Sequence, residues 1–454
     1  MMTPERRDAM DEMIVKIRSG RLTRRSFLER ATAIGLSSTA AVSLLEACGG
    51  TSGNTGGNGS TVNIVWQSEK DSTTPSVYQA VTNDFNNSVG RQKGIHVTWQ
   101  QGPASTNDLL TKYDDMLRAR SHSIDVMSVD VVYPAEFAAN GWSKPITNTQ
   151  WPSSARSNYL PGPIQSCTFQ GNLVAAPLRT DLGLMYYRKD IITTPPATWD
   201  DLVSMSKEAV AKGKTKYGYV WQGAQYEGLV CDFVEVLYGF GGTILDPNDS
   251  KKVTVNSPAA QQALAAMVSW VGTISPAAVT TYQEDDARLV WQNGNSAFMR
   301  NWPYAYSLGN ASGSAIANKF DIHGLLTGGS NTDGGHSCIG GWNLAINAYT
   351  PNGDASWEFI NYLLGPAAQK KLAIDASQTV SLQSVYDDSD VLAKQPLFGK
   401  LKPILQNAKP RPVSPRYPDL SNVLQQHLYA ALKKQETPSA ALSAISSSLQ
   451  TLVS

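Results

Sequence analysis

Short apolar runs alternate with amphipathic stretches in the first third of the chain. Runs over 62–66, 96–99 and 124–129 have the length and the β-branched content of strands. The stretches between them, 77–87 and 109–120, carry apolar residues at helical spacing. Strands that alternate with helices in this way favour the α/β class, with a mainly parallel sheet covered on both faces.

The ends of these predicted strands carry acidic residues. Glu69 follows the first strand, and Asp130 ends the third. Ligands of parallel sheets bind beyond the carboxyl ends of the strands, so both side chains are expected at one rim of the sheet.

Helix boundaries further along the chain are marked by capping residues. Thr198, followed by Asp201, predicts a capped helix over 199–211. Ser257 before Pro258 predicts a helix over 259–271, because proline suits the first helical position. The acidic runs 284–286 and 387–390 lack calcium-loop spacing and are expected to be solvated helix starts or turns.

The N-terminus has the pattern of an export signal. Arg24 and Arg25 precede an uncharged stretch, 31–45, that is shorter than the roughly 20 apolar residues of a membrane span. The paired arginines indicate the twin-arginine route. Leu45 and Ala47 before Cys48 are typical of a lipobox, although Glu46 is unusual there. We therefore expect a twin-arginine lipoprotein signal peptide over 1–47 and lipidation of Cys48. A flexible tether over 48–60 would follow, since that stretch is rich in Gly, Ser, Thr and Asn.

Composition narrows the function classes. The chain has 454 residues, 38 basic and 38 acidic, so nothing in the charge favours nucleic acid or an anionic membrane surface. Its length suits two lobes. Cys167, Cys231 and Cys338 have no zinc-ligand spacing. One disulfide with a free thiol and three buried thiols are both consistent with the sequence.

Aromatic and polar residues form a set that suits a carbohydrate. Sugars present flat C–H faces and hydroxyls, so a site needs aromatic platforms together with carboxylates and arginine. A glycine pair before Trp342 would let the backbone approach a ligand. The candidate platforms are Trp302, Tyr304 and Trp342, and the candidate polar partners are Glu69, Asp130, Asp181, Glu227 and Arg411.

Several motifs in this order resemble the extracellular solute-binding lipoproteins of ABC importers, in particular the trehalose/maltose-binding type. The matching stretches are residues 125–142, 180–190, 221–229, 300–306, 340–344 and 411–415. The resemblance covers the chain from about Val62 to the C-terminus.

The resemblance implies a two-lobed α/β fold of the periplasmic-binding-protein kind, with a mainly parallel sheet in each lobe. The chain would cross the hinge three times, near 177–181, 344–347 and 397–402. The N-terminal lobe would comprise residues 61–178 and 346–398, and the C-terminal lobe residues 179–345 and 399–454. The implied sugar-binding residues are Glu69, Asn107, Asp130, Asp181, Glu227, Trp302, Tyr304, Gly341, Trp342 and Arg411.

The function that follows is capture of an extracellular di- or oligosaccharide by hinge closure and its delivery to a permease with a cytoplasmic ATPase. Trehalose, maltose and related glucosides all remain candidates. We expect a membrane-anchored monomer without cofactor, metal site or catalytic residue. A secreted glycoside hydrolase and a sugar-sensing lipoprotein without a transport role are the alternatives. Product formation would identify the first, and an empty cleft without ligand-dependent stabilisation would favour a structural or sensory role.

Overall fold

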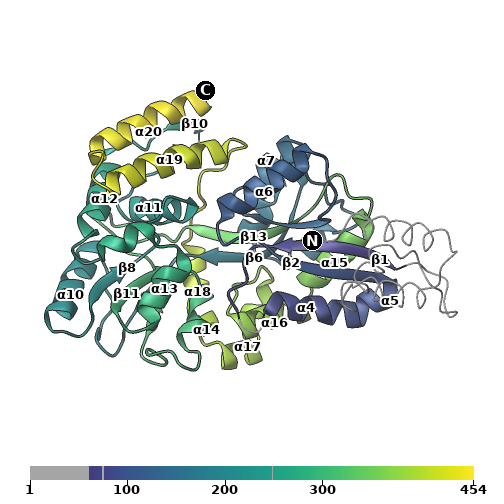
Figure 1. Cartoon of the computed structure of the whole chain (residues 1–454), viewed down its shortest axis with the longest axis horizontal. Coiled ribbons are helices and arrows are strands. Elements are labelled where there is room, and N and C mark those ends of the chain that lie inside the picture. Colours follow the sequence, from purple (N-terminus) through teal and green to yellow (C-terminus); the bar gives the residue numbers. More distant parts are fainter. Residues whose placement is uncertain (1–60, 74–75, 248, 454) are drawn as a thin grey trace, which may run out of the picture. The chain divides into compact units, whose positions relative to one another are not determined.

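The computed structural model describes residues 61–73, 76–247 and 249–453. The predicted signal peptide, the tether and Cys48 lie outside the described residues. In the described part, two separate sheets define two lobes, each with its own helices (Figure 1). The two-lobed α/β expectation is confirmed.

The N-terminal lobe is built on a five-stranded sheet of order β2-β1-β3-β13-β6. Its strands are β1 (Val62–Ser68), β2 (Ile95–Gln101), β3 (Val126–Asp130), β6 (Ala176–Leu182) and β13 (Ile339–Ile346). The pairs β1–β2 and β1–β3 are parallel, whereas β13 is antiparallel to both β3 and β6.

The C-terminal lobe is built on a four-stranded sheet of order β12-β7-β11-β8. Its strands are β7 (Leu184–Tyr187), β8 (Tyr217–Val220), β11 (Ser296–Asn301) and β12 (Asp321–His323). Only the β8–β11 pair of this sheet is parallel. The expectation of mainly parallel sheets is therefore wrong, and both are mixed. Strands that carry the chain from lobe to lobe and back must run in opposite directions, so they pair antiparallel.

Helices surround both sheets. On the N-terminal lobe these are α4 (Val77–Phe85), α5 (Arg91–Lys93), α6 (Thr106–Arg118), α7 (Pro134–Ala139), α8 (Ser153–Arg156), α9 (Pro161–Ser166), α15 (Gly353–Leu364) and α16 (Pro366–Ala376). The C-terminal lobe has α10 (Trp199–Ala211), α11 (Glu227–Gly239), α12 (Pro258–Trp270), α13 (Glu284–Gln292), α14 (Ala305–Gly309), α19 (Tyr417–Leu432) and α20 (Pro438–Val453). The short helices α17 (Ser389–Lys394) and α18 (Leu397–Gln406) pack against each other.

Local sequence explains several helix boundaries. Thr198 and Asp201 form the predicted capping box of α10, each side chain bonding the other residue's backbone N–H. The Ser257 hydroxyl accepts the Ala260 N–H at the start of α12, with Pro258 as its first residue. These caps satisfy backbone donors that would otherwise lack a partner within the helix.

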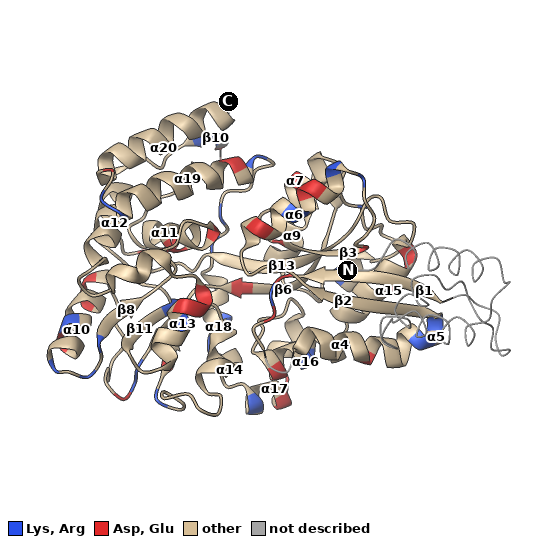
Figure 2. Ribbon diagram, in the orientation of Figure 1, with Lys and Arg blue, Asp and Glu red and all other residues tan. Residues whose placement is uncertain are grey.

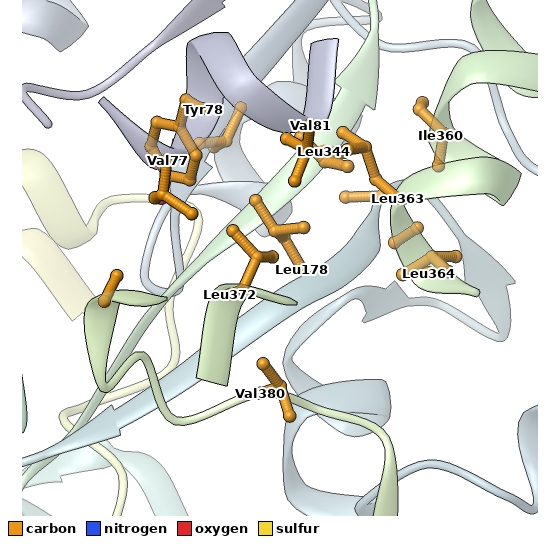
Figure 3. Close-up of a cluster of buried hydrophobic side chains, with 14 of the residues drawn as sticks. Val77, Tyr78, Val81, Leu178, Leu344, Ile360, Leu363, Leu364, Leu372 and Val380 are labelled. Carbon is orange, nitrogen blue, oxygen red and sulfur yellow. The ribbon is translucent and has the colours of Figure 1, made fainter. Parts of the chain in front are cut away.

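The core of the N-terminal lobe lies between its sheet and the helices α4, α15 and α16. Figure 3 shows side chains from these elements converging on Leu178 of β6 and Leu344 of β13. The same cluster continues into the C-terminal lobe through Leu184, Tyr186 and Trp291. The base of the two lobes therefore shares apolar packing.

The chain passes between the sheets at slightly different places from those expected. β6 stays in the first sheet to Leu182, and β7 starts in the second sheet at Leu184. The return precedes β13, which belongs wholly to the first sheet, rather than falling at 344–347. The last passage follows α18, because the chain contacts Tyr238 of α11 through Lys409 and Pro410.

The described residues contain no helix that is long and apolar enough to cross a membrane. Cys167, Cys231 and Cys338 are buried free thiols.

Candidate functional site

A cavity of about 290 Å³ lies between the two lobes. Glu69, just after β1, and Asp130, at the end of β3, both line it, so the expected common rim of the parallel strands is present. Figure 2 shows acidic residues where β6 and β13 approach the second lobe and at the start of α13. The volume is at the lower end of the roughly 300–1,000 Å³ that is usual for small-molecule sites.

Most of the predicted sugar-binding residues meet in this cavity. Those in its lining are Glu69, Asp130, Asp181, Glu227, Trp302, Tyr304, Gly341, Trp342 and Arg411. Asn107 does not line it, and faces an adjoining groove instead. The preceding residue, Thr106, lines the cavity and donates its hydroxyl to Asp130 at 3.2 Å. The residue of α6 that lines the cavity is therefore Thr106, one position before the predicted Asn107.

Arg179 organises the carboxylates of the N-terminal lobe. It lies two residues before Asp181 on β6, and alternate strand residues share a face, so its guanidinium bonds that carboxylate directly. The same guanidinium donates to Glu69 Oε1 at 3.0 Å through Nη2. Glu69 is 4% exposed, and its Oε2 has no hydrogen-bond partner among the described residues. One buried carboxylate oxygen of the cavity wall thus has no partner of its own in the described chain.

Arg411 joins the two lobes at the cavity. Its Nη1 donates to Glu227 on α11 at 2.5 Å, and its Nη2 donates to Asp130 on β3 at 3.1 Å. Glu227 also accepts from Tyr417 and Ser421 on α19. Burial raises the pKa of Glu227, and the charge of Arg411 acts in the opposite direction. Arg411 Nε is buried without a partner in the described part of the chain, which leaves one donor available.

Trp302 is held in a fixed orientation at the cavity. Its ring lies on the Arg300 guanidinium, whose central carbon is 3.9 Å from the ring centroid. Its Nε1 is 3.3 Å from Glu284 Oε1. A Cβ added at Gly340 would lie 3.0 Å from the indole, so the ring would have to shift slightly to admit a larger residue. The tryptophan borders the cavity in a fixed orientation, as a stacking platform for a sugar ring requires.

Gly341 has a structural reason to be glycine. Its φ is +135°, and an added Cβ would lie 2.4 Å from the carbonyl oxygen of Arg179. The pairing of β13 with β6 shifts register between Trp342 and Asn343, next to this close approach. In the regular pairing of β13 with β3, Trp342 lies opposite Asp130. The indole of Trp342 and the carboxylate of Asp130 therefore belong to paired residues on neighbouring strands.

Sequence reasoning missed several residues of the cavity wall. The run 284–286 does start a helix, but Glu284 and Asp285 line the cavity instead of facing solvent. The sequence did carry a hint of this, because the capping box with Gln283 uses only Asp286. Capping therefore does not account for the other two acidic residues of the run. Burial raises the pKa of Glu284, which accepts hydrogen bonds from Tyr226 and Trp302. Other residues missed are Lys70, Asp71, Arg179, Tyr226 and Gln378.

Comparison with known proteins places the chain in a family. The model of the bacterial extracellular solute-binding proteins matches residues 70–370. A probable ABC transporter-binding protein of Deinococcus radiodurans is 39% identical over 374 residues, which are 79% of this chain and 87% of the relative. The chain belongs to the bacterial extracellular solute-binding protein family. It is thus a solute-binding component of the ABC-transporter kind, as the motifs predicted.

Solved structures of the family agree with the two-lobed fold. Maltose-bound MalE3 of T. maritima is 36% identical, with a TM-score of 0.81 over 86% of this chain and 100% of that structure. The GacH receptor of Streptomyces glaucescens, solved unliganded and with acarbose, is 22% identical, with a TM-score of 0.76 over 87% of this chain and 98% of that structure. The second likeness shows the fold alone.

Proposed function

We propose that this family member captures an extracellular di- or oligosaccharide, such as maltose, trehalose or a related glucoside, and delivers it to an ABC importer. One observation carries the proposal: Glu69 and Arg411, each with a buried polar atom that has no partner in the described chain, line the same cavity as Trp302 and Trp342. Maltose-bound MalE3, at 36% identity, supports the choice of ligand class.

The proposed roles follow from the chemistry of each side chain. Glu69 Oε2 accepts from a sugar hydroxyl, and Arg411 Nε donates to one. Trp302 and Trp342 stack on the apolar faces of the sugar rings, and Gly341 allows the close approach. The other sugar-binding residues are Asp130, Asp181, Glu227 and Tyr304.

Capture depends on contacts that exist only when both lobes hold the ligand. A ligand that bridges groups of the two lobes favours the closed state by its differential affinity for it. Micromolar binding corresponds to about −8 kcal/mol. A few charge-assisted hydrogen bonds and two stacked rings supply this after the cost of ordering.

The protein acts at the outer face of the cytoplasmic membrane as a lipid-anchored monomer. The proposed anchor is Cys48, separated from the fold by the tether 48–60. Replacement by serine (Cys48→Ser) should release the protein from membranes with unchanged sugar affinity. A variant that stays membrane-bound after a salt wash would contradict the anchor.

A thermal-shift screen with maltose, trehalose, sucrose and longer maltooligosaccharides tests the proposal. The expected result is a rise in Tm with at least one sugar, followed by calorimetric titration of that sugar. No shift with any member of the panel would contradict sugar capture.

Glycoside hydrolysis is the second candidate, because burial raises the pKa of Glu284 at the cavity wall, as general acids require. Chromatography of the bound sugar after long incubation separates the two. We expect intact sugar with the unsubstituted protein. Product formation that disappears in Glu284→Gln would instead identify an active site.

A further inference from the structure

Asn107 makes a contact that crosses from one lobe to the other. It lies in the first turn of α6, and its Oδ1 accepts the backbone N–H of Glu227, the first residue of α11, at 3.1 Å. α6 belongs to the N-terminal lobe, and α11 packs with α12 and α19 of the C-terminal lobe.

Helix α11 lacks a cap from its own segment. Its N-cap residue, Tyr226, makes no side-chain capping bond. The first N–H groups of a helix have no acceptor within the helix, and asparagine is among the preferred residues that supply one. Asn107 therefore provides, from the other lobe, the side-chain acceptor that Tyr226 does not provide for the start of α11.

A sugar-binding role for Asn107 does not fit its surroundings. The groove that it faces has a volume of about 670 Å³, and Tyr226 is the one aromatic residue in its lining. An additional sugar unit there would lack stacking platforms. The groove is lined by polar side chains of α6 and α7 on one lobe and α19 on the other, so it is a place where the lobes meet.

A second polar contact also crosses the cavity. Lys70, just after β1, places its Nζ 2.6 Å from Asp285 on α13. Burial alone would raise the pKa of Asp285, but hydrogen bonds and charges from Lys70 and Arg288 lower it, so the carboxylate is ionised at neutral pH. This ion pair is partly exposed, with 39% of the lysine side chain accessible, and salt should weaken it.

We propose that Asn107 is a positioning residue of the cleft, which caps helix α11 across the lobes and so sets how long the closed protein retains its sugar. The inference rests on the proposed function. The Asn107–Glu227 bond exists only while the lobes are together, so it stabilises the closed state relative to the open one. It does not involve the sugar, so it acts equally on every ligand. Lys70 and Asp285 assist it from the cavity wall.

Stopped-flow tryptophan fluorescence on the mature chain, with maltose and trehalose as probes, tests this. Asn107→Ala should raise the dissociation rate constant about fivefold, the effect of losing a typical N-cap. The association rate constant should change less than about twofold, since affinity changes within one complex are expressed mainly in dissociation. The maltose-to-trehalose affinity ratio should stay constant.

Two variants complete the design. Asn107→Asp should restore slow dissociation, because aspartate caps as well as asparagine and its charge suits a helix N-terminus. Asn422→Ala, an exposed asparagine on the α19 side of the same groove, should leave both rate constants unchanged. An unaltered dissociation rate in Asn107→Ala, or a changed sugar ratio, would overturn the proposal.

The two proposals fail in different ways. If the unsubstituted protein binds no sugar, capture fails, and small-angle scattering of the ligand-free chain then decides the role of Asn107. A larger radius of gyration in Asn107→Ala than in Asn422→Ala supports the cap across the lobes. Equal radii in that case overturn it.

Discussion

Two buried arginines have similar neighbours and different positions in the molecule. Arg300, on β11, is 1% exposed and lies within the C-terminal lobe, where Glu235 accepts from its Nη2 at 2.6 Å and from its Nε at 2.7 Å. Gln222 accepts from its Nη1 at 3.2 Å. Arg411 is 3% exposed and is paired with carboxylates of both lobes, yet its Nε has no partner in the described chain.

The difference indicates that Arg300 supports a neighbouring side chain, whereas Arg411 has a donor to offer at the cavity. Every nitrogen of Arg300 that can donate is satisfied from its own lobe, so its guanidinium forms a fixed base under Trp302. A buried charge with complete partners rigidifies its surroundings. Arg411 retains a free donor beside the cavity, and burying an unpaired polar group is costly. A ligand that supplies the missing partner is therefore favoured.

Loss of Arg300 should have the largest effect on stability. Arg300→Met leaves Glu235 and Asp232 buried without their cation, which typically costs about 3–5 kcal/mol. Urea denaturation measures the loss. The control is Arg416→Ala, which removes an exposed ion pair with Asp419 and should cost less than about 1 kcal/mol. Equal losses in the two variants would remove the distinction between supporting and exposed arginines.

Loss of a cavity carboxylate should act on affinity. Asp130→Ala and Asp181→Ala should each weaken sugar binding by about 1.5–3 kcal/mol, because charge-assisted hydrogen bonds to hydroxyls disappear. Calorimetric titration measures the change. The corresponding Asp→Asn variants should lose less, since the amide keeps one acceptor. Unchanged affinity in both alanine variants would exclude these residues from the site.

Trp342 should behave as a platform. Trp342→Ala should weaken binding by about 2 kcal/mol while the ligand-free Tm changes little, because the ring is partly exposed beside the cavity. Trp199, which is 2% exposed in the C-terminal core, is the matched control. Trp199→Ala should lower Tm sharply by leaving a core cavity. A large drop in Tm for Trp342→Ala with normal affinity would assign the ring to the core.

The smallest expected effect is at Glu136, where a substitution should change stability in a pH-dependent way. The Oε2 of this carboxyl has no partner among the described residues. Burial, together with the charges of Asp114 and Asp419, raises its pKa from the ordinary 4.5 to about 7. The folded state then holds more protons than the unfolded state between these values, so this group lowers stability as pH rises from 4.5 to 7. Glu136→Gln should therefore melt above the parent at pH 8 by thermal scan, and the difference should vanish near pH 4. A constant difference across pH would contradict this.

Local sequence predicted the parts of the fold that depend on neighbouring residues. The ends of β1 and β3 and the caps of α10 and α12 are set by residues within a few positions, so their patterns were readable. The direction of strands β13 and β7 could not be predicted in this way, because it depends on how the chain passes between the lobes. Trp302 and Trp342, which were predicted from sharp motifs, line the cavity. Asn107, which was predicted only from an approximate distance along the chain before Asp130, does not line it.

The sequence by itself determined the family, the two-lobed plan and the residue types that could hold a sugar. Only the tertiary structure decided which polar atoms remain unpaired. Arg179 and Glu69 are 110 residues apart, and Arg411 pairs with Glu227 and Asp130 across 184 and 281 residues. Whether a buried polar atom finds a hydrogen-bond partner depends on which distant groups folding brings next to it. No local pattern could therefore predict that Glu69 Oε2 and Arg411 Nε would be left free at the cavity.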